Sequence, residues 1–219
     1  MLHIVLDPCC GININRHRSP IWSNMTQLYE WKFNRSIVNK IKMFFLKKSI
    51  PIHILTNTKQ SEYLSDKIRK INSLVEKYGK YNVLVISIQV NRGKKSGWEC
   101  LYHEKNELSK EYAEVFSKTY KSSKIPFPNN GIRHYNMSIM RLAKCPSIVT
   151  NNLYIDTKKD CMYLLTSKGE KAIKDLHIDA IYNSIEFYKN NIKEWENLQQ
   201  KSQAKVDSLD LKEKEQLSQ

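Results

Sequence analysis

Two adjacent cysteines, Cys9 and Cys10, are the first residues of this chain whose side chains offer more than packing. They follow the apolar run 2–7, which is typical of a buried strand. Thiolate sulfur and imidazole nitrogen are both zinc ligands, so a Cys/His metal site is one hypothesis. The histidines expected in loops or at a strand end are His17, His103 and His134. The simpler hypothesis is that the two cysteines are small, half-buried residues at a strand end.

The cysteine count and the charge limit the classes of protein that remain. The chain has five cysteines, an odd number, and no CxxC spacing, so we predict reduced thiols and no disulfide framework. It carries 36 Lys and Arg against 22 Asp and Glu, a formal net charge of +14. Such a basic protein is attracted to nucleic acid, to an anionic envelope or to an acidic partner. Because lysines are spread along the whole chain, we do not expect nucleic acid to be the partner.

The hydropathy pattern predicts a globular protein. Hydrophobic residues make up 41% of the 219 residues, which is enough for a sizeable core. No apolar run reaches the roughly 18 residues that a membrane span needs. The first residues lack the basic and apolar regions of a signal peptide, so we expect a protein made in the cytoplasm without a secretion signal.

Strand and helix patterns alternate along the chain. Short apolar runs predict strands, and apolar residues at three- and four-residue spacing predict helices. The predicted strands are 2–7, 51–56, 82–90, 97–103 and 147–155, and the predicted helices are 30–48, 61–78, 107–121 and 168–188. The segment 124–135 contains Pro126, Pro128 and Gly131 and is predicted to be a loop. This alternation indicates a single α/β domain, with a mostly parallel twisted sheet flanked by helices on both faces.

The residues at the predicted strand ends form an ordered set of blocks between about residues 2 and 186. The blocks are Leu6-Asp7-Pro8-Cys9-Cys10-Gly11, then Glu30, then Val85-Ile86-Ser87-Ile88-Gln89-Val90-Asn91, then Gly97-Trp98-Glu99-Cys100, then Cys145-Pro146-Ser147-Ile148-Val149-Thr150-Asn151-Asn152. Together they resemble the zinc-dependent N-acetylmuramoyl-L-alanine amidase family, in the branch that includes bacteriophage endolysins. The resemblance implies an amidase-like fold for the domain.

The same resemblance implies where the zinc site would lie. In that family a His after the first strand, a Glu at the start of the first helix and a His at a later strand end bind zinc, and a Glu on the last strand activates the water. These positions fall on Cys10, Glu30, Gln89 and Asn151, of which only Glu30 keeps the family's residue. An amide is a weak ligand and cannot act as a general base. Arg141 stands where the family has a basic residue and is predicted to remain as a structural salt-bridge partner.

These departures predict a degenerate amidase that is not an enzyme and needs no cofactor. We interpret the chain as a non-catalytic structural or binding component of a bacteriophage virion or tail, made in the bacterial host cytoplasm. Its expected partners are other virion proteins in an assembly, with peptidoglycan as a further contact. The alternative is a divergent zinc amidase that cleaves the N-acetylmuramoyl–L-alanine bond of peptidoglycan.

The C-terminal segment differs in composition from the rest of the chain. We predict an amidase-like domain over residues 1–188 and an extension over 189–219, either helical or disordered. The candidate partner-binding residues of the extension are Trp195, Leu198 and Leu209. A solvated tail without a role is the alternative interpretation of this segment.

Overall fold

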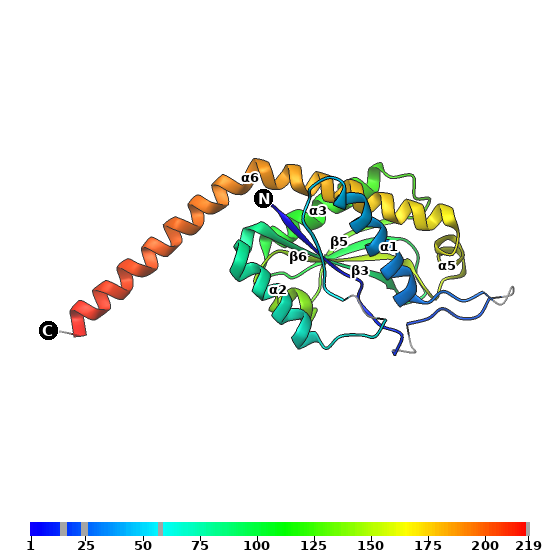
Figure 1. Cartoon of the computed structure of the whole chain (residues 1–219), viewed down its shortest axis with the longest axis horizontal. Coiled ribbons are helices and arrows are strands. Elements are labelled where there is room, and N and C mark those ends of the chain that lie inside the picture. The colour runs from blue at the N-terminus through cyan, green and yellow to red at the C-terminus, as the bar shows by residue number, and fades with distance from the viewer. Residues whose placement is uncertain (14–16, 23–25, 57–58, 218–219) are drawn as a thin grey trace. The chain divides into compact units, whose positions relative to one another are not determined.

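A six-stranded mixed sheet forms the centre of the protein (Figure 1). The structure, a computed structural model, describes residues 1–13, 17–22, 26–56 and 59–217. The strands, in the order in which they lie in the sheet, are β2 (Ile52–Ile54), β1 (His3–Asp7), β3 (Val83–Asn91), β6 (Ser147–Tyr154), β4 (Trp98–Tyr102) and β5 (Asn129–His134). Strands β2, β1, β3 and β6 are parallel to one another, β4 is antiparallel to β6, and β5 is parallel to β4. The predicted α/β class is confirmed.

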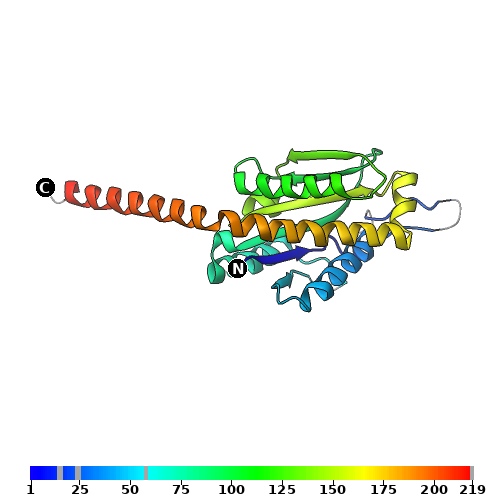
Figure 2. The same cartoon turned by 90° about the horizontal axis from the view of Figure 1, so that it is seen from above.

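Helices cover both faces of this sheet. They are α1 (Glu30–Leu46), α2 (Leu64–Tyr78), α3 (Glu107–Ser122), α4 (Ser138–Leu142), α5 (Lys158–Leu164) and α6 (Ser167–Leu217), with a 3-10 turn η1 at Lys80–Asn82. On one face, α2 and α4 bury a core against the sheet that includes Ile71, Val85, Met140 and Val149. On the other face lie α1, α3 and residues 167–184 of α6 (Figure 2), where the rings of Trp98 and Tyr120 stack. None of the described helices is both long and apolar enough to cross a membrane.

The main error of the sequence prediction concerns the segment 124–135, which was expected to be a loop. Residues Asn129–His134 form β5, which pairs with β4 through partners such as Cys100 and Ile132. The two prolines precede the strand, where they remove no ladder hydrogen bond, and Gly131 takes a φ of +80° at an irregular step in the register. The short helices α4 and α5 also lack a sequence prediction.

The last helix extends beyond its predicted end near Tyr188. Helix α6 runs to Leu217, so the extension takes the helical form of the two alternatives. The chain divides into two units, Met1–Ser184 and Ile185–Gln219. Within the second unit, the ring of Trp195 lies 5.6 Å from that of Phe187 and 6.5 Å from that of Tyr188. The side chains of Leu198 and Leu209 lie outside the described residues, and partner binding by the extension stays a prediction.

Candidate functional site

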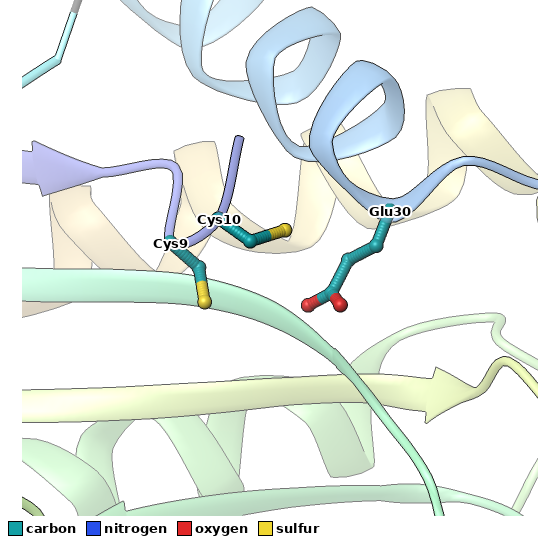
Figure 3. Close-up of side chains that lie close together, drawn as sticks. All are labelled: Cys9, Cys10 and Glu30. Atoms are coloured by element: carbon teal, nitrogen blue, oxygen red, sulfur yellow. The ribbon is translucent and has the colours of Figure 1, made fainter. Parts of the chain in front are cut away.

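Three potential metal ligands meet where β1 ends and α1 begins (Figure 3). The sulfur atoms of Cys9 and Cys10 and a carboxylate oxygen of Glu30 all lie within 4.8 Å of one another. Cys10 and Glu30 are each only 3% exposed, and Cys9 is half-buried. The side chain of Cys10 points toward Glu30 (Figure 3). The fold therefore places a buried thiol and a carboxylate at the position where the resemblance implies a zinc site.

Two cationic side chains fix the backbone of the cysteine turn. Cys9 has a φ of 59°, an uncommon conformation for a residue other than glycine. Lys67 donates to the carbonyl oxygen of Cys9 at 2.6 Å, and Arg35 donates to that of Cys10. Lys67 also pairs with the buried Asp7 at 2.8 Å, which ties the turn to the end of β1. Helices α1 and α2, which carry Arg35 and Lys67, thus hold the turn in place.

His17 joins this cluster from the loop between β1 and α1. Its Nδ1 lies 2.5 Å from Oε2 of Glu30, and its carbonyl oxygen accepts from the backbone N–H of Glu30 at 3.0 Å. An antiparallel bridge between Arg18 and Tyr29 closes the loop next to it. His17 was one of three histidines considered for a Cys/His site, and only the folded loop distinguishes it from the others. His103 and His134 line a separate cavity of about 350 Å³.

Hydrogen bonds within the cluster shift the pKa values of its members in different directions. The pKa of Cys10 is lowered to about 7, because its sulfur accepts hydrogen bonds from Cys9 and from His17, which outweigh the effect of burial. The pKa of Cys9 is raised, because this thiol donates to Cys10 and because its sulfur is largely removed from water. The pKa of His17 is raised to about 9 by its hydrogen bonds to Cys10 and Glu30. Near neutral pH the cluster therefore combines an acidic thiol with an imidazolium.

The chemistry of these donors fits zinc. Sulfur of cysteine, nitrogen of histidine and oxygen of glutamate are the usual protein ligands of this ion, and a catalytic site uses three of them with one open position. Cys10, His17 and Glu30 provide one donor of each kind, and Cys9 provides a further sulfur. Glu30 is itself oriented by the backbone N–H of Val90, which donates to its Oε1 at 3.1 Å. Potential zinc ligands therefore lie close together here, although Gln89 stands where the resemblance implies a second histidine.

The other predicted positions make contacts that the sequence analysis does not foresee. Nε2 of Gln89 lies 3.8 Å from Sδ of Met137, and Nδ2 of Asn151 donates to Oε1 of Glu99 at 2.8 Å. Gln89 lines a cleft of about 700 Å³, and His17 and Glu30 line the same cleft.

Arg141 is exposed and does not form the predicted salt bridge with any described residue. It donates to Oδ1 of Asn136 and to Oγ of Ser138 instead. The arginine lies on α4, whose short helix was not predicted, and the nearest acceptors there are neutral side chains of its own segment.

Comparisons with known proteins identify the fold. Residues 4–183 match the family model described as N-acetylmuramoyl-L-alanine amidase. The N-acetylmuramoyl-L-alanine amidase of Clostridium difficile 630 has a similar structure, with a TM-score of 0.74 and 21% identity over 84% of this chain and 97% of that one. The catalytic domain of CwlV, an N-acetylmuramoyl-L-alanine amidase from Bacillus (Paenibacillus) polymyxa var. colistinus, gives a TM-score of 0.72 and 17% identity over 85% and 99%.

The catalytic domain of an endolysin is also among the similar structures. The catalytic domain of the CD27L endolysin, which targets Clostridia difficile, gives a TM-score of 0.61 and 19% identity over 84% of this chain and 98% of that one. No curated protein sequence matches the chain.

These comparisons correct the prediction that the chain is not an enzyme. The matching family and the similar structures are amidases, which contradicts a loss of catalysis inferred from single positions. The fold brings His17 beside Glu30 and Glu99 beside Asn151, so single positions of the sequence do not describe the whole site. The predicted resemblance to N-acetylmuramoyl-L-alanine amidases is confirmed over residues 4–183, whereas zinc dependence and the phage branch stay predictions. The chain belongs to the N-acetylmuramoyl-L-alanine amidase family.

Proposed function

We propose that the chain is a zinc-dependent amidase that hydrolyses the bond between N-acetylmuramic acid and L-alanine in peptidoglycan. The observation that carries this proposal is the donor cluster at the end of β1, in which Cys9, Cys10 and Glu30 lie together and His17 contacts Glu30; Cys10 and Glu30 are buried. Membership of the amidase family and the cleft of about 700 Å³ beside the cluster support it.

Each residue of the cluster has a distinct role in this proposal. Cys10, His17 and Glu30 would hold the ion, and Cys9 would orient the sulfur of Cys10 or add a fourth donor. A bound zinc ion supplies Lewis-acid polarisation of the carbonyl and lowers the pKa of a bound water to about 7. Arg18 and Arg92 line the same cleft, where their charge would attract the carboxylates of peptidoglycan.

The test combines zinc content with peptidoglycan clearing. We expect the purified protein to retain one zinc ion per chain after dialysis and to clear a suspension of peptidoglycan. The substitutions Cys10→Ser and His17→Gln should each lower zinc affinity at least 10-fold and slow clearing accordingly. His134→Gln is the matched control, because His134 is exposed and lies in another cavity. Folded wild-type protein that neither binds zinc nor clears peptidoglycan would overturn the proposal.

The predicted place in a bacteriophage virion or tail, with virion proteins as partners, stays a prediction. Neither the fold nor the family membership tests it.

A further inference from the structure

Glu99 is a buried carboxylate on β4 that contacts side chains of β6 and β3. It lies on β4, yet its Oε1 accepts from Nδ2 of Asn91 on β3 and from Nδ2 of Asn151 on β6, both at 2.8 Å. Since β6 lies between β3 and β4, the carboxylate of Glu99 occupies the space above β6. Only 7% of the residue is exposed.

The strand register explains this position. Gln89, Asn151 and Glu99 form one row across three neighbouring strands, because Gln89 pairs with Asn151 and Asn151 pairs with Glu99. Directly paired residues present their side chains on the same face of a sheet. Asn91, which holds the carboxylate from the other side, lines the same cleft as His17 and Glu30. The carboxyl group of Glu99 thus lies next to the end of the Asn151 side chain. A glutamate at position 151 would place its carboxyl group in the same space.

The other buried carboxylates of the described residues have different tasks. Asp7 pairs with Lys67 and accepts from Ser87, and Asp160 accepts from the backbone N–H groups of Gly97 and Tyr154. Glu30 belongs to the donor cluster. Glu99 is held by two neutral amides, and its guanidinium neighbour Arg133 is half exposed and no closer than 3.3 Å.

We propose that Glu99 on β4 is the general base of the reaction, in place of the glutamate that the resemblance implies at position 151 on β6. This inference rests on the proposed function. The carboxylate of Glu99 accepts one proton from the attacking water, and the oxygen of that water forms a bond to the amide carbonyl carbon. The carbon–nitrogen bond then breaks, and the proton passes from Glu99 to the nitrogen of L-alanine, which leaves as an amine. The muramoyl fragment leaves as a carboxylic acid and loses its proton to solvent. Asn151 acts as a positioning residue that directs the carboxylate.

The test compares Glu99→Gln with a control at an exposed glutamate, Glu107→Gln. General-base catalysis contributes about 10²- to 10⁴-fold to a rate, so kcat of Glu99→Gln should fall by about that factor. Zinc content, KM and melting temperature should remain those of the wild type. The double variant E99Q/N151E returns a carboxylate from β6 to the same space and should recover kcat at least about 10-fold. Glu99→Asp keeps the negative charge but shortens the side chain by one methylene group, which moves the carboxylate away from Asn151. This variant gives a second measurement if Glu99→Gln does not fold.

The outcomes separate this inference from the proposed function. If the wild type is active and Glu99→Gln keeps more than about a tenth of its kcat, Glu99 is not the base although the amidase activity stands. A double variant no more active than Glu99→Gln would also contradict the role of Glu99, because a purely structural carboxylate would give that result. Wild-type protein that binds zinc but cleaves no amide would overturn the proposed function, and the role of Glu99 with it.

Discussion

Lys67 and Asp7 form a buried ion pair directly behind the cysteine turn. Their charged atoms lie 2.8 Å apart, and the side chains are 8% and 3% exposed. Oδ2 of Asp7 also accepts from the hydroxyl of Ser87, and Lys67 donates to the carbonyl oxygen of Cys9. The pair therefore stabilises the end of β1 and the geometry of the donor cluster together.

We expect the substitution Lys67→Met to lower the free energy of unfolding by about 3–5 kcal/mol, because it leaves the carboxylate of Asp7 buried without a partner. Lys70→Met is the matched control, since the pair of Lys70 with Glu62 is partly exposed and should cost less than about 1 kcal/mol. Urea unfolding of both variants at neutral pH measures the difference. Equal losses in the two variants would show that the Asp7–Lys67 pair does not support the turn.

The sequence predicted the position of the site but not its complete set of residues. Cys10 and Glu30 could be found because each lies next to the end of a predicted element, and such ends meet at one edge of a parallel sheet. His17 comes from an irregular loop, and its distance to Glu30 depends on the bridge between Arg18 and Tyr29. Glu99 depends on the antiparallel pairing of β4 with β6, which a prediction of a mostly parallel sheet does not contain.

At the scale of elements, His177 joins α6 to the centre of the sheet. Its Nδ1 donates to the carbonyl oxygen of Ile173 at 2.8 Å, so its Nε2 accepts from the hydroxyl of Thr150 on β6 at 2.9 Å. The side chain is completely buried, and burial lowers the pKa of this imidazole to about 4. The folded structure keeps this histidine neutral, whereas the unfolded chain lets it bind a proton at higher pH. The folded state therefore loses stability as the pH falls below the pKa of the unfolded histidine.

We therefore expect acid to weaken the folded state through His177. The unfolded histidine titrates near pH 6.5, so this contribution is complete above that pH and is lost as the pH falls toward 4. The loss should amount to about 3 kcal/mol, from the difference between the two pKa values. Urea unfolding at pH 7 and pH 4.5 tests this, with His177→Gln expected to show a smaller pH dependence. The exposed His134→Gln should behave like the wild type, and an unchanged pH dependence in His177→Gln would contradict the assignment.

The helices and strands could be predicted from the sequence wherever a single hydrophobic pattern dominates a segment. The apolar positions of α1 and α2 recur at helical spacing, and β3 is almost continuously apolar because both of its faces are covered. β5 contains the sequence Asn-Asn-Gly-Ile-Arg-His, whose polarity is that of a loop. It is a strand because it lies at the edge of the sheet, where only β4 needs to pair with it.

At the scale of the whole molecule, the two units of the chain differ in what they contain. The hydrophobic cluster that packs α2 and α4 against the sheet lies in the unit Met1–Ser184, and the donor cluster lies there as well. The family match also ends at residue 183. We therefore expect that deletion of residues 190–219 changes the melting temperature by less than about 2 °C, since little core is removed.

The same deletion addresses the predicted role of the extension in an assembly. It should leave zinc content and peptidoglycan clearing unchanged while it abolishes co-purification with any larger particle. A fall in melting temperature of more than about 5 °C would show that the extension stabilises its own chain, and the prediction of a partner-binding segment would then be wrong.

The most direct test of the whole account identifies the bond that the protein cleaves. Purified peptidoglycan is incubated with the zinc-loaded protein, and new amino termini and new reducing sugar ends are both measured. Cleavage between muramic acid and L-alanine should release peptides with a free N-terminal alanine, with no increase in reducing ends, and the chelated protein should release none. Absence of new N-terminal alanine with folded, zinc-loaded protein would contradict the account.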